Sequence, residues 1–335
     1  MAIPKVVDQS IIDENFVKWN IPRPDKDYRV VVHCSTYKHE SYIEDALKGF
    51  VMQKTNFPFC AIVIDDGSPD RTPVIIKQYA ASYPDIIKPI LLGENHMQHG
   101  MSRNPYFEEW HKRTKYIALC EGDDYWTDPH KLQKQVDFLE KNEDYVLVHT
   151  DKYVEFGADG VRCTCPHSSE GENVNSLLKA NTIATCTTLY RVATYHKISE
   201  LLSSICRNNH LPMGDYPLWL LLAEYGKIAF LPDFTAVYRV LSESASHTRN
   251  VKKAVAFDDG TIRCKIIFYQ RYIANNGYSN KLNLEFNEMI FHMRKRMLLD
   301  YGWAARGQII PLLKMLPHWQ YICMQSIKRK LNQRK

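Results

Sequence analysis

Apolar runs and helical patterns alternate along residues 28–142, and this alternation constrains the fold more than any other feature of the sequence. The apolar runs are rich in β-branched residues, and most are followed by a segment whose apolar residues recur at helical spacing. Elements of these lengths in this order are typical of βαβ units. The sequence therefore predicts an α/β protein with a Rossmann-like sheet, with strands at 28–36, within 59–70, and at 86–93 and 115–120, and helices at 40–54, 72–83 and 129–142.

Polar side chains, and not glycine-rich loops, follow the first two predicted strands. Ser35, Thr36 and Tyr37 follow the first, and Asp65 and Asp66 follow the second, while neither a G-x-G-x-x-G nor a Walker pattern occurs in the chain. Ligands of open α/β sheets bind outside the carboxyl ends of the strands. A carboxylate there accepts hydrogen bonds from a base or a ribose, and a tyrosine ring stacks on a base. The alternative is that the two aspartates form an Asx turn or cap the next helix.

Three carboxylates, Glu121, Asp123 and Asp124, follow the fourth apolar run. Oxygen ligands without nearby histidine or cysteine suit a hard cation such as Mg²⁺ or Mn²⁺, which in turn binds a diphosphate. A simple turn is the alternative for this acidic loop. Asp128, which stands before Pro129, is expected to cap the helix that begins there.

Composition limits the class of protein and its compartment. A chain of 335 residues with 45% hydrophobic content can bury one large core or two smaller ones. The first residues lack the basic and then apolar pattern of a signal peptide, and no stretch has the length and apolarity of a membrane span. Nine cysteines, an odd number scattered along the chain, favour a reducing compartment. We therefore expect a cytoplasmic protein without a nucleic-acid partner.

Basic residues are concentrated at the carboxyl end. Residues 301–335 hold seven Lys or Arg and no acid, so the other 300 residues carry −2 of the net charge of +5. The segment 251–335 shows amphipathic helical patterns, and Trp319 stands among apolar residues just before the basic end. Such a helix can lie on an anionic membrane surface, here the inner face of the plasma membrane. A helical extension packed on the rest of the protein is the alternative.

Six segments occur in an order that resembles one enzyme family. They are "VVVHCSTYKHESYI", "IVIDDGSPDRT", "ENHMQHG", "YIALCEGDDYWTDPHKLQKQVDFLE", "GDYPLWLLLAEYGKIAFLPDFTAVYRV" and "SASH". Over residues 28–247 the chain resembles a family-2 glycosyltransferase of the GT-A fold, of the bacterial surface-polysaccharide type. The resemblance implies an N-terminal arm at 1–27, a catalytic domain at 28–250 with a nucleotide-sugar half (28–128) and an acceptor half (129–250), and a helical basic extension at 251–335.

The resemblance assigns the donor site to the loops that follow the first two strands. It implies that Ser35 and Asp66 contact the nucleotide base and that Thr36, Tyr37 and Asp65 shape the same pocket. Arg103, which lies between the third and fourth strands, is a candidate for the donor phosphates. The alternative for this arginine is a basic, solvated helix.

The resemblance also implies a metal site. The D-x-D motif of the family falls on Glu121, Gly122 and Asp123 and is followed by Asp124. Because a glutamate replaces the first aspartate, we expect Asp123 and Asp124 to contact Mn²⁺ or Mg²⁺ or the sugar, and Glu121 to bind a ribose hydroxyl. His247 either supplies an imidazole to the metal or diphosphate or is a solvated loop residue.

The catalytic base of the family falls on Asp215, where the preceding glutamate of the E-D motif is replaced by Gly214. In an inverting displacement this carboxylate removes the proton of the acceptor hydroxyl. Without the family context, Asp215 would be interpreted as the N-cap of the apolar helix that follows. Asn181 and Thr187 lie in a segment that resembles the acceptor side of the family and are expected to contact the acceptor.

The resemblance implies metal-dependent, inverting transfer of a sugar from a nucleotide-diphosphate sugar, expected to be UDP-linked, to a hydroxyl of a glycan. The expected acceptor is lipid-linked and serves polysaccharide synthesis. Two alternatives remain. A sugar nucleotidyltransferase would carry a Gly-rich basic loop after the first strand, which "HCSTYKHE" lacks. A non-catalytic nucleotide-sugar-binding protein would not require Asp215.

Overall fold

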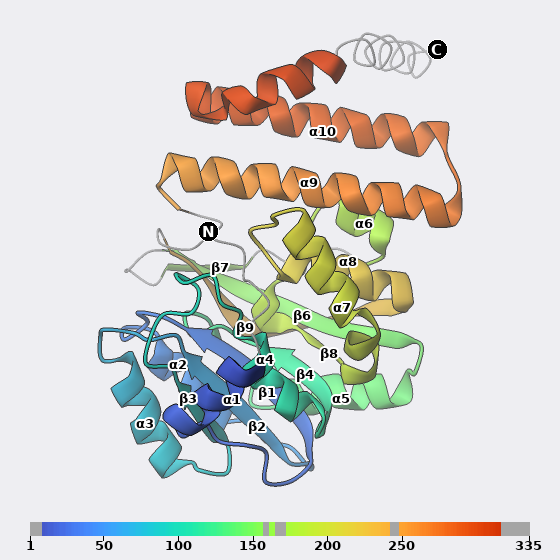
Figure 1. The fold of residues 1–335 in the computed structure, drawn as a ribbon. Coiled ribbons are helices and arrows are strands. Elements are labelled where there is room, and N and C mark those ends of the chain that lie inside the picture. The colour runs from blue at the N-terminus through green and yellow to red at the C-terminus, as the bar shows by residue number, and fades with distance from the viewer. Residues whose placement is uncertain (1–8, 157–160, 165–171, 242–247, 316–335) are drawn as a thin grey trace. The chain divides into compact units, whose positions relative to one another are not determined.

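A computed structural model describes residues 9–156, 161–164, 172–241 and 248–315 of the chain (Figure 1). The chain forms two compact units, each described here by itself. The first comprises residues 1–173, 182–208 and 214–240, and the second comprises 174–181, 209–213 and 241–335.

A mixed β-sheet forms the centre of the first unit. Its first four strands are parallel, in the order β3-β2-β1-β4, which confirms the predicted α/β fold. Their bounds are Tyr28–Thr36 (β1), Phe59–Asp65 (β2), Ile87–Leu91 (β3) and Thr114–Leu119 (β4). The described part of the sheet continues in the order β8-β6-β9-β5, and β7 pairs with β6. These strands are Tyr125–Trp126 (β5), Tyr145–Phe156 (β6), Val161–Thr164 (β7), Leu189–Arg191 (β8) and Lys227–Val240 (β9).

Helices cover both faces of this sheet (Figure 1). Alternate residues of a strand point to opposite faces, so β1 contributes Val30 and Val32 to one core and Val31 to the other. Helices α2, α3 and α5 pack in the first core, and α1 and α4 in the second. The helices of this unit are Gln9–Lys18 (α1), Ile43–Val51 (α2), Thr72–Ser82 (α3), Asn104–His111 (α4), Lys131–Lys141 (α5), Val192–Asn208 (α7) and Asp215–Tyr225 (α8), with a 3-10 turn at Thr185–Thr187 (η1).

The segment predicted as an N-terminal arm contributes to the second core. Ile12 and Phe16 of α1 are 2% and 6% exposed and pack in one cluster with Trp110 of α4. The side-chain amide of Asn15 donates to the hydroxyl of Tyr106 at 2.8 Å. Residues 11–21 therefore pack as part of the first unit.

The helix predicted from Pro129 begins two residues later than expected. Its first residue is Lys131, and its N-cap, His130, makes no side-chain capping bond. The carboxylate of Asp128 accepts from the backbone N–H of His130 at 2.8 Å and pairs with Lys134 at 2.8 Å. Asp128 thus orders the turn before the helix, and the prediction that it caps a helix starting at Pro129 is wrong.

The described part of the second unit is helical. It contains Val174–Lys179 (α6), Val251–Asn276 (α9), Asn280–Tyr301 (α10) and a 3-10 segment at Gly302–Gln308 (η2). The ammonium of Lys265 on α9 donates to the carbonyl of Leu178 at 2.5 Å, and a β-carbon on Gly260 would lie 2.2 Å from Pro212. These contacts explain why two short segments from earlier in the chain belong to this unit.

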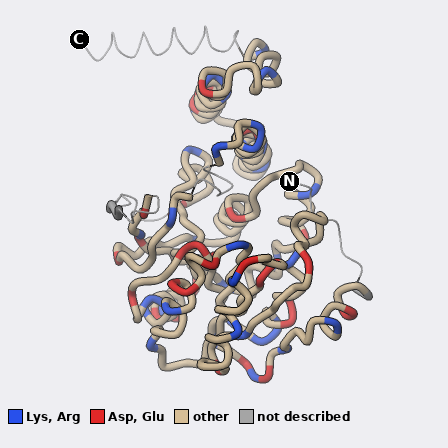
Figure 2. The backbone as a smooth tube through the Cα atoms, turned by 90° about the vertical axis from the view of Figure 1, so that its left-hand side faces the viewer, with Lys and Arg blue, Asp and Glu red and all other residues tan. Residues whose placement is uncertain are grey.

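Both long helices of the second unit carry acids among their basic residues (Figure 2). Asp258 accepts from the hydroxyl of Tyr301 at 2.8 Å, and Asp259 pairs with Arg263 at 2.8 Å. The described helices are therefore not uniformly basic. Within the described residues, no helix is long and apolar enough to cross a membrane. The basic end of the chain, from Lys328 to Lys335, lies outside the described residues.

Candidate active site

Parallel pairing brings the predicted donor-site loops to one edge of the sheet. Thr36 pairs with Asp65 at the carboxyl ends of β1 and β2, and β1 also pairs with β4, which leads into the acidic loop. The backbone N–H of Asp66 donates to the carbonyl of Thr36 at 3.0 Å, and that of Gly122 donates to the carbonyl of Ser35 at 3.0 Å. Three loops that are distant in sequence are thereby fixed side by side.

Gly122 lies where the acidic loop passes close to β1. A β-carbon at this position would lie 2.7 Å from both the Cβ and the Oγ1 of Thr36. Real β-carbons do not approach side-chain atoms so closely, so any larger residue would displace the loop. The glycine between Glu121 and Asp123 is therefore required by packing.

Asp66 is almost completely buried, at 1% exposed. Its two carboxylate oxygens accept from the backbone N–H groups of His96 at 2.9 Å and Met97 at 3.3 Å. The guanidinium of Arg103 lies 3.9 Å from the same carboxylate. Asp66 thus holds the loop after β3 and brings Arg103 to this edge of the sheet; a contact with the nucleotide base stays a prediction.

Asp65 and Thr36 each have a buried oxygen without a partner. Asp65 is 2% exposed and Thr36 is 1% exposed. The Oδ2 of Asp65 accepts from the backbone N–H of Ser68 at 3.0 Å, which is the turn contact considered from the sequence. Among the described residues, Asp65 Oδ1 and Thr36 Oγ1 make no hydrogen bond. A buried polar atom left unpaired costs about 1–3 kcal/mol, so these two oxygens favour a ligand that supplies the missing partners.

Burial raises the pKa of Asp65, although hydrogen bonds from Ser68 oppose the change. A carboxylate that lacks full hydrogen bonding is less favourable in its charged form, because water no longer solvates it. A ligand that donates a hydrogen bond would restore the normal ionisation. Ser35 and Tyr37 are half-buried beside this site, and the ammonium of Lys38 lies 5.3 Å from the Tyr37 ring centre.

The acidic loop forms one electrostatic group with Asp215. Desolvation by the surrounding protein, and then the negative charges of Asp123 and Asp215, raise the pKa of Glu121 to about 7, while Arg103 opposes the change. Because the side chain of Glu121 is itself exposed, water screens part of the desolvation and of the repulsion between the acids. The structure therefore brings the predicted base and the predicted metal loop within electrostatic reach of each other.

Asp124 differs from the other two acids because it is 2% exposed. Its Oδ1 accepts from the backbone N–H of Arg239 at 2.8 Å. Burial and then the negative charge of Asp123 raise its pKa well above the ordinary range. One carboxylate oxygen of Asp124 is therefore occupied by a hydrogen bond from the backbone of β9.

Arg239 is a residue of this site that the sequence analysis did not select. Its guanidinium donates to the carbonyl of Asp123 at 3.0 Å, to Glu155 at 2.8 Å and to Asp45 at 2.6 Å. It also lies 4.3 Å from the ring centre of Tyr125. A charged residue in the apolar strand "FTAVYRV" was the available signal, because a buried guanidinium requires partners.

Asp215 is the first residue of α8, and Gly214 is the N-cap. Within the described residues, no side chain caps this helix, so the interpretation of Asp215 as the N-cap is wrong. The hydroxyl of Thr185 donates to the Asp215 carboxylate at 3.5 Å. Burial raises the pKa of Asp215, and backbone N–H groups and Thr185 oppose the change. Asp215 is therefore not the N-cap residue, and its carboxylate has the raised pKa expected of a base that works near neutral pH.

The structure places the two predicted acceptor contacts differently. Thr187 is 1% exposed, and its hydroxyl donates to the carbonyl of Ala184 at 2.7 Å. This arrangement does not favour a contact with an acceptor, and Thr185 is the threonine of η1 that reaches Asp215. Asn181 is exposed and belongs to the second unit. His247 lies outside the described residues.

The residues fit a divalent cation through Asp123. Among the described residues, no group of three metal-binding side chains is assembled. One oxygen of Asp124 is occupied by Arg239, whereas Asp123 is only half-buried and its carboxylate makes no hydrogen bond within the described chain. A hard cation prefers carboxylate oxygen and would offset the repulsion between Asp123 and Glu121. Asp123 is the side chain that would hold such an ion, together with the phosphates of a donor.

Comparisons with known proteins assign the chain to a family. The family model for Glycosyl transferase family 2 matches residues 31–199. An uncharacterized protein of Mycobacterium tuberculosis is 39% identical over 207 residues, which are 61% of this chain and only 56% of that relative. The Bacillus subtilis protein EpsE, provisionally named a glycosyltransferase, is 30% identical over 224 residues, 66% of this chain and 76% of EpsE.

Among solved structures, the chain matches that of S. aureus TarS in complex with UDP. It is 16% identical, with a TM-score of 0.48 over 85% of this chain and 88% of that chain. The predicted resemblance to the family and to its GT-A fold is confirmed by the family match and the observed α/β architecture. Because the family model spans half of the sequence, the chain belongs to family 2 of the glycosyltransferases.

Proposed function

We propose that the protein is an inverting glycosyltransferase that moves a sugar from a nucleotide-diphosphate sugar to a hydroxyl of a glycan. One observation carries the proposal. Asp215 heads α8 without capping it, has a raised pKa, and interacts electrostatically with Glu121 of the acidic loop. A base within electrostatic reach of an acidic loop that binds the donor suits a displacement at an anomeric carbon.

The donor would bind at the edge formed by β1, β2 and β4. Asp65 and Thr36 offer the unpaired oxygens for the base and ribose, and Ser35 and Tyr37 border the same site. Glu121 would bind a ribose hydroxyl, and Arg103, which lies 3.9 Å from the Asp66 carboxylate, would neutralise a phosphate. UDP is the nucleotide we expect from the family resemblance.

Asp123 would hold Mn²⁺ or Mg²⁺ at this edge. Asp124 would hold the acidic loop in place through its hydrogen bond with the backbone N–H of Arg239 on β9. When bound, such an ion neutralises the negative charge that develops on the departing diphosphate. Arg239 positions the backbone of Asp123 through its carbonyl. The chain thus supplies one ligand and a rigid support for it.

The chemical step requires a base on the acceptor side. The Asp215 carboxylate takes the proton of the acceptor hydroxyl while that oxygen bonds to the anomeric carbon and the bond to the diphosphate breaks. The hydroxyl of Thr185 donates to the same carboxylate and orients it. A single displacement of this kind inverts the anomeric configuration.

Nucleotide binding tests this proposal directly. We expect UDP with Mn²⁺ to raise the melting temperature of the protein, because a ligand that binds only the folded state stabilises it. Asp123→Ala should lose the part of the shift that depends on Mn²⁺, and Asp137→Ala, an exposed acid on α5, should keep it. Equal shifts for the Asp123→Ala and unmodified proteins at saturating Mn²⁺ would remove Asp123 from the metal site. A nucleotidyltransferase would instead respond to a nucleoside triphosphate and a sugar phosphate.

We further propose that the acceptor is a lipid-linked glycan made for a surface polysaccharide at the inner face of the plasma membrane. Support comes from the sequence of the carboxyl end, where five basic residues follow Trp319 and other apolar residues. Asn181 is retained as an acceptor contact. Deleting residues 318–335 should release the protein from anionic liposomes and leave transfer to a soluble acceptor unchanged. Unaltered liposome binding would contradict the membrane role.

A further inference from the structure

The amino ends of two strands and the start of a long helix meet at the opposite edge of the same sheet. Tyr28 at the start of β1 pairs with Thr114 at the start of β4. Strand β8 is antiparallel to β4 and pairs Arg191 with Tyr116, so α7, which begins at Val192, starts at this edge. This edge is distinct from the one that carries the acidic loop.

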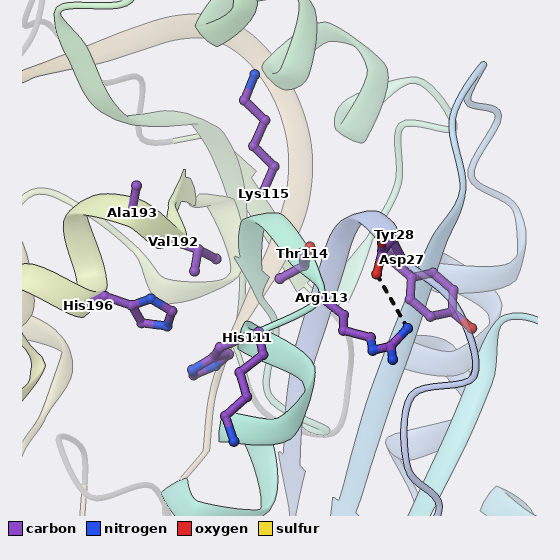
Figure 3. A pocket seen from close by; sticks show the side chains of 10 residues that line it. Asp27, Tyr28, His111, Arg113, Thr114, Lys115, Val192, Ala193 and His196 are labelled. Atoms are coloured by element: carbon purple, nitrogen blue, oxygen red, sulfur yellow. Dashed lines mark ion pairs between the residues drawn. The ribbon is translucent and has the colours of Figure 1, made fainter.

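A pocket of about 490 Å³ lies at this edge (Figure 3). Its volume is in the range of pockets that hold small molecules, about 300–1,000 Å³. The lining carries three basic side chains, Lys112, Arg113 and Lys115, and one acid, Asp27. The charged groups of the lining therefore favour an anionic ligand.

His111 provides a buried polar group in this lining. It is 4% exposed, and its Nε2 lies 3.0 Å from the Nε2 of His33. Its other ring nitrogen, Nδ1, has no hydrogen-bond partner among the described residues. Burial and then the nearby His196 lower the pKa of His111 to about 3. The ring is therefore neutral near pH 7, and Nδ1 carries the proton when His33 donates to Nε2.

His196 approaches the same place from α7. It lines the pocket, and its ring centre lies 6.2 Å from that of His111; Figure 3 shows the two side chains on neighbouring helices. Helix α7 has 17 residues, and the backbone N–H groups of its first turn lack partners within the helix. The positive end of a helix with free amides attracts anions. Val192 and Ala193 of that first turn also line the pocket.

The basic side chains of the pocket have acidic partners, but those pairs are exposed. Lys112 pairs with Glu109 at 2.8 Å, and Arg113 pairs with Asp27 at 3.5 Å, as Figure 3 shows. Lys115 pairs with Glu140 at 2.8 Å, and the side chains of the three pairs are between 32% and 84% exposed. Exposed pairs contribute little to stability, so a ligand with two negative charges can replace them.

We propose that this pocket binds a phosphate group, with Lys112, Arg113 and His196 around it and His111 donating from the buried side. The phosphate belongs either to a free small molecule or to a lipid headgroup. A strand rises about 3.3 Å per residue, and β1 has 9 residues, so the two edges are roughly 30 Å apart. Binding here leaves the donor site open. The inference goes beyond the proposed transfer and does not depend on it.

Histidine NMR tests the proposal without an activity assay. We expect inorganic phosphate, added at constant ionic strength and pH, to shift the ring resonances of His111 and His196 in a saturable manner. The double variant Lys112→Gln/Arg113→Gln should raise the dissociation constant about tenfold, since two charged contacts are lost. Lys77→Gln, which removes an exposed cation on α3, is the matched control and should change nothing.

Two outcomes would overturn the proposal: the absence of a saturable shift in the unmodified protein, or an equal loss of affinity in the control and the double variant. A parallel titration with phosphatidylcholine vesicles, with and without phosphatidic acid, separates the two sources of phosphate. Binding of the phosphatidic acid vesicles that requires Lys112 and Arg113 supports a headgroup. Binding of inorganic phosphate alone supports a free ligand.

Discussion

The acids around Arg239 and the acids around Asp215 lie in one unit but differ in how their charges are satisfied. Glu155 and Asp45 pair with the Arg239 guanidinium, and Asp124 accepts its backbone N–H. Asp215 has no cationic partner among the described residues and interacts with backbone N–H groups of its own turn and, at 3.5 Å, with the hydroxyl of Thr185. A carboxylate with fixed partners supports structure, whereas one with few partners remains available for a reaction. The role of an acid in this site therefore depends on its hydrogen bonds and ion pairs, and not on its place in a sequence motif.

Asp215→Asn should give the largest effect on activity. The amide cannot accept the acceptor proton, so we expect turnover to fall by about 10²–10⁴ with donor affinity unchanged. Steady-state kinetics with a soluble acceptor and a donor-binding assay measure the two quantities. Asp128→Asn, which alters a paired carboxylate outside the site, should retain turnover. Full activity of Asp215→Asn would break the comparison, because an acid without a cationic partner would then have no chemical role.

Arg239→Met should give the largest loss of stability among the paired residues. Arg239 is 7% exposed and Glu155 is 8% exposed, so removing the cation leaves a buried charge, at a loss of roughly 3–5 kcal/mol. Urea unfolding measures the change. Arg296→Met removes an exposed partner of Asp300 and should cost less than about 1 kcal/mol. If both variants lose the same stability, the Arg239 network is not a structural support.

The smallest effect is expected from the pH dependence of Glu121. The folded pKa of about 7 is above the model-compound value of 4.5, so the folded state holds the proton more tightly than the unfolded state. The contribution of Glu121 to stability is therefore full below about pH 4.5 and is lost as the pH rises through 7.

Because the Glu121 side chain is exposed, solvent screening should limit this loss to about 1 kcal/mol or less. The free energy of unfolding of Glu121→Gln should decline less than that of the unmodified protein between pH 5 and pH 7.5. Identical pH profiles would show that Glu121 does not share the electrostatic environment of Asp123 and Asp215.

Local patterns predicted the first half of the fold well. Strands β1 and β4 and helices α2 and α3 agree with their apolar runs within a few residues. A continuous apolar run is typical of a strand buried in a parallel sheet, and burial of one face gives each helix its periodic pattern. The paired strands β6 and β9 depend on contacts between residues more than 80 positions apart, such as the bond between Thr150 and Thr235. Such pairings are not encoded in a short window of sequence.

The candidate site shows the same limit. The positions of Asp65 and Asp123 after strands followed from the pattern, since the carboxyl ends of parallel strands share an edge. The contact of Arg239 with the Asp123 carbonyl spans 116 residues and could not be derived locally. Of the two threonines of η1, Thr187 donates its hydroxyl to the nearby backbone carbonyl of Ala184, whereas the hydroxyl of Thr185 reaches Asp215. Only the folded chain determines which of them contacts Asp215.

The packing of α1 also bears on how this protein can be shortened for experiments. The family match begins at residue 31, and trimming the chain to that point would be a natural choice for expression. Such trimming would remove Ile12 and Phe16 and uncover apolar residues of β2 and α4 in the same core, among them Ile62 and Trp110. The shortened protein would expose an apolar surface and aggregate. Its inactivity would then say nothing about catalysis.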